Sequence, residues 1–182
     1  MATAATAAVK AKKKTDYPKQ INKTLAKISP WWIYGVGLVP AAYYFYSGAI
    51  NDLGANPIQT FEHLLGEWAL RFMIVVLLVT PLRDLTRINL YRFRRAFGLL
   101  VFYYVLFHFL TYFILDRAMN LPVIVVDIFR RPYIILGMTA FTCLIALAAT
   151  SNNRSIQKLG SWWGRLHRLV YLIAALGVIH FF

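Results

Sequence analysis

The residues of this sequence whose type and spacing suit chemistry are histidines, and two of the four lie deep inside apolar runs. His108 follows the charged start of one run by about 12 residues, and His180 follows Arg168 of another run by the same number. At about 1.5 Å per residue of helix, both imidazoles lie roughly 18 Å from the same boundary and can face each other. Two neutral imidazoles on facing helices can hold haem iron from its two sides. The pattern therefore predicts a haem site, and the simpler alternative is a pair of helix-bridging hydrogen bonds.

A third histidine, His167, lies at the charged end of the last apolar run. It precedes His180 by 13 residues, about 20 Å along a helix, which suits two redox centres near opposite faces of a membrane. The positions 13 and 14 residues before His108, however, are Arg95 and Arg94, so a second bis-histidine site lacks its partner. His167 can bind a haem with another ligand, contact a flavin or face lipid headgroups. The two arginines can bind a flavin phosphate or a haem propionate, although basic residues at this boundary commonly serve only as anchors.

Other polar groups near the apolar runs have simpler interpretations. Arg71 follows Glu67 by one helical turn, so the simpler interpretation is an ion pair between them. The alternative is that Arg71 binds a haem propionate. His63 is expected to be an ordinary interfacial residue. The single cysteine, Cys143, cannot form an internal disulfide and is expected to be a buried, unreactive thiol.

The elements that must position these histidines are the apolar runs themselves. Of the 182 residues, 59% are hydrophobic and 16% aromatic, and the mean hydropathy is +0.55, which indicates more apolar surface than one soluble core can bury. The runs are close to the length of about 20 residues that a helix needs to cross a bilayer. The sequence therefore predicts an all-α integral membrane protein, a bundle of about five transmembrane helices. The expected helices cover residues 31–50, 64–82, 96–115, 132–153 and 162–182.

The basic residues are distributed unevenly around these runs. Of the 20, 16 lie before the first run, in the connection after the second run, or in and around the connection between the fourth and fifth runs. The opposite loops, residues 51–63 and 116–131, hold only three arginines against four acidic residues. Because Lys and Arg in short loops are retained on the cytoplasmic side, residues 1–30 are expected to form a basic cytoplasmic tail and 31–182 the transmembrane domain. The net charge of +13 then indicates membrane lipids as partners, and no nucleic-acid-binding module is readable.

Seven short motifs occur in an order that closely resembles the MsrQ family, formerly called YedZ, over roughly residues 31–182. The motifs are LGANP at 53–57, GEWALRF at 66–72, TPLR at 80–83, RRAFGLL at 94–100, HFLTY at 108–112, RPYIILG at 131–137 and RLHRLVY at 165–171. Because several motifs coincide in order, the resemblance is specific. Members of this family are haem-binding membrane subunits of bacterial methionine-sulfoxide reductase systems, related to ferric-reductase-like transmembrane domains.

The resemblance implies a transmembrane b-type cytochrome of the bacterial inner membrane, with one or two haem b groups, and it leaves open whether FMN also binds. Electrons would come from the quinone pool or a cytoplasmic flavin reductase. They would pass to a periplasmic, molybdenum-containing subunit of the MsrP type, and that partner would reduce methionine sulfoxide in oxidised envelope proteins. The family's histidine positions fall on His108, His167 and His180, which are therefore the expected iron ligands.

The last apolar run is short, and two other functions are compatible with the sequence. Members of the family normally continue into another helix, whereas Leu169 to Phe182 are only 14 residues, about 21 Å of helix, so a C-terminal sixth helix is expected to be lacking. A stand-alone transmembrane metal or quinone reductase would keep the haem without the methionine-sulfoxide partner. A non-redox membrane scaffold or transporter, whose histidines only bridge helices, is the remaining alternative.

Overall fold

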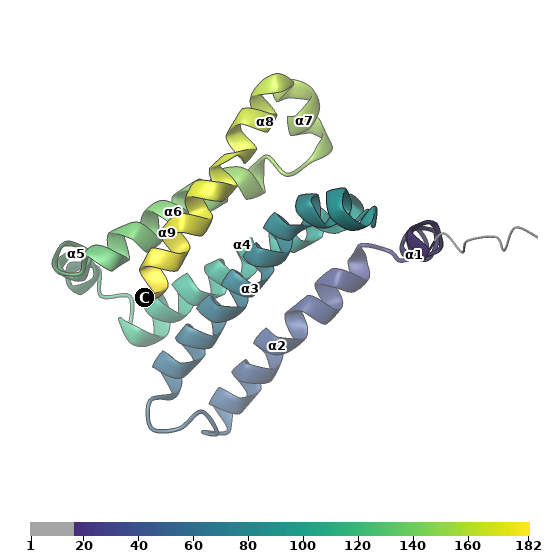
Figure 1. The fold of residues 1–182 in the computed structure, drawn as a ribbon. Helices are drawn as coiled ribbons and strands as arrows, with labels where there is room; N and C mark the ends of the chain where they lie inside the picture. The colour runs from purple at the N-terminus through teal and green to yellow at the C-terminus, as the bar shows by residue number, and fades with distance from the viewer. Residues whose placement is uncertain (1–16) are drawn as a thin grey trace, which may run out of the picture.

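The computed structural model describes residues 17–182, and this part of the chain consists of helices and their connections, without a strand (Figure 1). The first 16 residues of the expected tail lie outside the described residues. The elements are α1 (Tyr17–Leu25), α2 (Trp31–Ala49), α3 (Pro57–Thr86), α4 (Tyr91–Leu110), the π-helix η1 (Thr111–Asp116), α5 (Leu121–Arg130), α6 (Pro132–Ala149), α7 (Asn153–Leu159), α8 (Ser161–His167) and α9 (Leu169–Phe181).

Membrane-spanning length and composition distinguish the long helices. In the described range, three helices are long and apolar enough to cross a membrane, namely α3, α4 with its η1 extension, and α6. α2 has 19 residues and is not among these three helices. α9 has 13 residues and follows α8 after a single intervening residue, Arg168. The predicted fold class, an all-α membrane protein, is confirmed.

Helix boundaries near the loops expected on the outer side differ from the expectation. α3 begins at Pro57 rather than at residue 64, because proline suits the first turn of a helix, where its missing N–H has no partner. Residues 121–130, expected to be loop, form α5. The side chain of Asn120 caps this helix by accepting a hydrogen bond from the backbone N–H of Val123 (3.3 Å). At 10 residues α5 is too short to cross a bilayer.

The expected fourth and fifth spans are also divided by the structure. Helix α6 ends at Ala149 rather than at residue 153, and α7 begins separately with Asn152 as its cap. The Asn152 side chain accepts a hydrogen bond from the backbone N–H of Ser155 (2.8 Å), which favours a new helix start over continuation of α6. The expected span 162–182 is split into α8 and α9.

Two helix pairs form the framework of the bundle. The most extensive pairings join α3 with α4 and α6 with α9, while α2 packs along α3 and α4 (Figure 1). Contacts of α4 with α6 and of α3 with α9 hold the two pairs together. The most buried large side chains, Leu65, Leu100 and Tyr104, lie on α3 and α4. The core of the bundle therefore follows these two long helices.

Tyr104 also fixes α2 against α4. Its hydroxyl donates to the backbone carbonyl of Gly37 (2.7 Å) and accepts from the backbone N–H of Ala41 (3.1 Å). Both partners flank Pro40, which cannot donate a helical hydrogen bond, so the hydroxyl enters α2 where the helical hydrogen bonds are already interrupted. Gly37 permits this close approach, because a Cβ there would overlap the side chain of Leu100.

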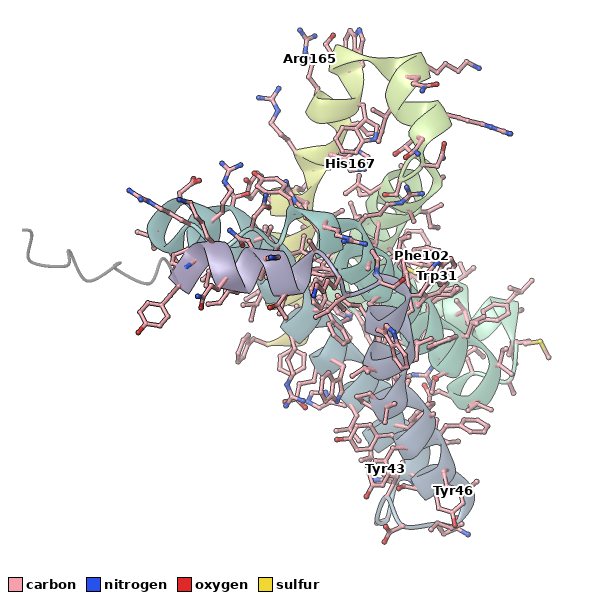
Figure 2. The ribbon with its side chains drawn as sticks, turned by 90° about the vertical axis from the view of Figure 1, so that its right-hand side faces the viewer. Trp31, Tyr43, Tyr46, Phe102, Arg165 and His167 are labelled. Atoms are coloured by element: carbon pink, nitrogen blue, oxygen red, sulfur yellow. The ribbon has the colours of Figure 1, made fainter. Side chains whose placement is uncertain are left out.

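The two ends of the bundle carry different side chains. Arg165 and His167 lie at one end, on α8, whereas Tyr43 and Tyr46 lie toward the opposite end, on α2 (Figure 2). We name the end that carries α7 and α8 the inner end, and the end that carries η1 and α5 the outer end, after the orientation expected from the basic residues.

Candidate functional site

A cavity of about 410 Å³ lies between α3, α4, α6 and α9. This volume falls within the range of small-molecule and cofactor sites. His108 of α4 and His180 of α9 both line the cavity. The centres of their imidazole rings are 6.0 Å apart, and the ring planes make an angle of 89°. The structure thus brings together the two histidines that the sequence analysis placed at equal depth.

The spacing of the two imidazoles suits a metal ion between them. Metal–imidazole bonds are about 2 Å long and a ring centre lies roughly 1 Å behind its nitrogen, so two rings on opposite sides of one ion have centres about 6 Å apart. The cavity wall around the pair is apolar, and the rings of Phe109 and Phe141 pack there with centres 5.0 Å apart. The residues present therefore fit an iron porphyrin, since histidine binds haem iron and the porphyrin ring needs apolar contacts.

His108 is oriented by the outer part of α3. Its Nδ1 lies 2.8 Å from the backbone carbonyl oxygen of Glu62. Because a carbonyl oxygen only accepts, Nδ1 carries the proton, and Nε2 of the neutral ring keeps a lone pair for a metal. The Glu62 carboxylate oxygen Oε1 lies 3.8 Å from Nε2. The ring lies beside Gly66, where a Cβ would be 3.5 Å from Nδ1, an ordinary contact distance.

His180 is oriented in the same manner by the start of α6. Its Nδ1 donates to the backbone carbonyl oxygen of Tyr133 over 2.7 Å, which again leaves Nε2 free to bind a metal. The ring lies against Gly137, where a Cβ would come within 2.8 to 3.1 Å of three imidazole atoms. Both candidate ligands are thus held through Nδ1 by a backbone carbonyl of a neighbouring helix.

Two arginines lie at the outer end of the cavity. Arg117 Nε lies 2.7 Å from Asp127 Oδ2 and 3.2 Å from Asp116 Oδ2, and Arg131 Nε lies 3.7 Å from Asp127 Oδ1. Burial acts to lower the pKa of Arg117, but the hydrogen bond with Tyr112 and the two nearby carboxylates outweigh burial, so the pKa is raised. Arg117 therefore stays charged. Fixed guanidinium groups of this kind bind carboxylates and phosphates.

His167, predicted as a third cofactor ligand, lies at the inner end (Figure 2). Its Nδ1 donates to the carbonyl oxygen of Trp163 in its own helix (3.1 Å), and its Nε2 lies 3.5 Å from Ser151 Oγ. The imidazole stacks on the Trp163 ring with centres 3.9 Å apart. The other three histidines of the sequence all line the cavity, so His167 stands apart from them.

Arg94 and Arg95, the predicted anion-binding residues, lie near the start of α4 at the inner end. Arg95 donates to Asn153 Oδ1 over 3.3 Å, which links α4 to the start of α7. The Arg94 guanidinium lies 5.9 Å from the ring centre of Tyr91. Neither arginine lines the cavity.

The structure agrees with the simpler interpretation of Arg71 but not with that of His63. Arg71 pairs with Glu67 Oε1 and lies 4.8 Å from the ring centre of Trp68, outside the cavity lining, as the plain ion-pair reading predicts. His63, expected to be only interfacial, lines the cavity and stacks on Phe181 with ring centres 4.7 Å apart.

Several cavity residues escaped the sequence analysis. Arg117 and Arg131 were counted only as loop charges, although the structure places both at the cavity. Gly66 and Gly137 were quoted only as letters of the GEWALRF and RPYIILG motifs. Glycine weakens a helix interior, so its presence within two apolar helices was a signal that something packs closely at these positions.

Comparisons with known proteins identify a family and several relatives. Residues 65–178 match the family described as ferric reductase like transmembrane component. The chain is 55% identical over 170 residues to proteins from Brucella ovis, Brucella canis and Brucella suis, each named protein-methionine-sulfoxide reductase heme-binding subunit MsrQ. The matched region covers 93% of this chain and 74% of each relative. No solved structure matches.

Proposed function

The chain belongs to the ferric reductase like transmembrane component family and, within it, to the MsrQ family, and on that premise we propose that it is a haem-binding membrane subunit conducting electrons to a protein-methionine-sulfoxide reductase. One observation carries the proposal for this chain: His108 and His180 face each other at 6.0 Å across a cavity of about 410 Å³. In this role the chain conducts electrons, and reduction of the sulfoxide takes place in the partner.

His108 and His180 are the residues that would hold the iron of a b-type haem, each through Nε2. The bound haem supplies the one-electron chemistry. The chain's own residues do the rest: the carbonyls of Glu62 and Tyr133 hold the Nδ1 protons and orient the rings, and the apolar wall excludes water. These contacts would keep both imidazoles neutral and in place.

The outer end of the cavity holds two guanidinium groups of the kind that bind carboxylates, and Asp116 and Asp127 balance their charge. Arg117 and Arg131 line it, and both already hold the carboxylate of Asp127. We assign the haem propionates to these two arginines rather than to Arg71, which pairs with Glu67 outside the lining.

His167, Arg94 and Arg95 are the proposed inner cofactor contact, for a second haem with another ligand or for FMN. Support comes from the positive charge of the inner end and from the imidazole stacked on Trp163, an aromatic surface of the kind that flat rings contact. The arginines would bind a flavin phosphate or a propionate.

The proposed direction of electron flow is from the inner to the outer end. Electrons enter from the quinone pool or a cytoplasmic flavin reductase and leave to a periplasmic, MsrP-type molybdenum subunit that docks on the outer loops. The concentration of 16 of 20 basic residues on the inner side supports a cytoplasmic N-terminus in a bacterial inner membrane. His108 precedes Asp116 by eight residues, roughly 12 Å, so the outer site lies close to that face.

The test is an absorption spectrum of the purified chain followed by reoxidation. Dithionite is expected to produce the sharp Soret and α bands of a reduced b-type haem, and these bands should decay when an MsrP-type subunit and methionine sulfoxide are added together. A chain without haem would establish the scaffold alternative. Haem that is reoxidised by ferric chelates or quinones, but never by the partner with sulfoxide, would establish a stand-alone reductase.

A further inference from the structure

The same local arrangement holds both cavity imidazoles, although it occurs on two different helices. Each Nδ1 donates to a helix carbonyl, over 2.8 Å to Glu62 on α3 and over 2.7 Å to Tyr133 on α6. In both helices the residue four places after that carbonyl is glycine: Gly66 follows Glu62, and Gly137 follows Tyr133. Each imidazole therefore binds one carbonyl and packs against the glycine one turn later.

The spacing of four residues has a direct physical meaning in a helix. The carbonyl of residue i accepts the N–H of residue i+4, and the side chain of that later residue leans back toward the N-terminus over the same turn. A side chain at i+4 therefore covers the carbonyl at i. Glycine leaves the oxygen uncovered, so its second lone pair can accept a hydrogen bond from another helix.

The two glycines differ in how tightly the imidazole fits. A Cβ on Gly137 would lie 2.8 Å from Cε1 and 2.9 Å from Nδ1 of His180, closer than real side chains approach. A Cβ on Gly66 would lie 3.5 Å from Nδ1 of His108, an ordinary contact. His180 must therefore move if Gly137 gains a side chain, whereas His108 can tolerate alanine at Gly66.

We propose that Gly66 and Gly137 are positioning residues that expose the carbonyls of Glu62 and Tyr133 to the two imidazoles, and that Gly137 is the stricter of the pair. The inference rests on the proposed function, since it takes these imidazoles as iron ligands. The hydrogen bond to Nδ1 fixes the tautomer and the rotation of each ring and raises the basicity of Nε2. Removing the bond should therefore change the ligand field of the iron as well as its affinity.

The experiment compares Gly137→Ala, Gly66→Ala and Gly66→Val in the full chain, with Gly98→Ala as the matched control. Gly98 lies in α4, the helix of His108, and a Cβ there would meet nothing within 4 Å. The readouts are haem content, the ferric electron paramagnetic resonance spectrum and the midpoint potential, with helicity by circular dichroism as the measure of folding. Loss of the hydrogen-bond partner of a metal-binding histidine typically lowers metal affinity by about 10- to 100-fold. We expect Gly137→Ala to lower the haem affinity by an amount in this range.

The expected order of perturbation is Gly137→Ala and Gly66→Val strongly, Gly66→Ala weakly and Gly98→Ala not at all. A Gly137→Ala protein with unchanged haem content, spectrum and potential overturns the inference. If Gly137→Ala does not fold, Gly66→Val provides the test. A Gly66→Val protein whose haem content, spectrum and midpoint potential equal those of the wild type overturns the inference. His108→Ala and His180→Ala proteins separate the two hypotheses: full haem retention by both defeats the proposed function, whereas haem loss by both beside an unaffected Gly137→Ala defeats only the glycine inference.

Discussion

The outer and inner ends of this bundle each contain histidine beside aromatic rings, but they use it differently. At the outer end, imidazoles from α4 and α9 meet across a cavity, and each is held by a carbonyl of another helix. At the inner end, His167 is held by its own helix and by stacking on Trp163. The two outer imidazoles are thus each fixed at Nδ1 by a second helix and line a cavity, whereas His167 is fixed at Nδ1 by its own helix and is not among the lining residues.

Replacing His180 by alanine should have the largest effect, because it removes one of the two proposed iron ligands. We expect the haem affinity of the outer site to fall by more than about 100-fold, which exceeds the usual effect of losing only the hydrogen-bond partner of a metal-binding histidine. The pyridine haemochrome assay on purified protein measures this loss. His167→Ala is the matched change at the inner end, and we expect this variant to keep the outer haem. If His167→Ala loses all haem while His180→Ala keeps it, the haem site lies at the inner end, contrary to this prediction.

Replacing Arg117 by alanine should have the next largest effect, since it leaves two carboxylates at the outer end without their main partner. The side chains of Arg117 and Asp127 are only 22% and 13% exposed. We expect a loss of about 1–3 kcal/mol in the free energy of unfolding, between the values for exposed and buried ion pairs. Detergent-phase denaturation with Asp127→Asn as a second variant measures it, and additive losses in the double variant would contradict a direct pair.

Replacing Trp163 by phenylalanine should have a smaller effect, confined to the inner end. The indole Nε1 donates to the carbonyl oxygen of Thr150 (3.0 Å), which ties α8 to the end of α6, and phenylalanine keeps an aromatic ring beside His167. Loss of this hydrogen bond should cost about 1 kcal/mol. Hydrogen exchange should rise in residues 150–167 while the outer haem content stays unchanged. A fall in outer haem content would show that the two ends are coupled.

Replacing Arg83 by alanine should have the smallest effect. Its partner is the adjacent Asp84, with a shortest N–O distance of 2.9 Å, and the two side chains are 43% and 58% exposed. Exposed ion pairs contribute little to stability, so the unfolding midpoint should not change measurably. Together with Arg117→Ala this variant tests whether burial, rather than the number of ion pairs, decides which charges stabilise the bundle. A loss as large as that of Arg117→Ala would refute that view.

The sequence by itself determined the fold class and the depth of the two main histidines. Apolar runs of membrane-spanning length require helices, because lipid offers backbone groups no other partners. The distance of His108 and His180 from charged boundaries follows from the rise per residue of a helix, which is a local property. Both conclusions could therefore be reached without knowing how the helices pack.

Only the tertiary structure decided which groups surround the histidines. The partners of His108 and His180 are a carbonyl and a glycine on α3 and α6, and the choice depends on how each helix is rotated against its neighbour. The rotation of each helix also decides that His63 lines the cavity and that His167 does not. Rotation and crossing are set by the fit of side chains along whole interfaces, so residue spacing within one helix cannot specify them.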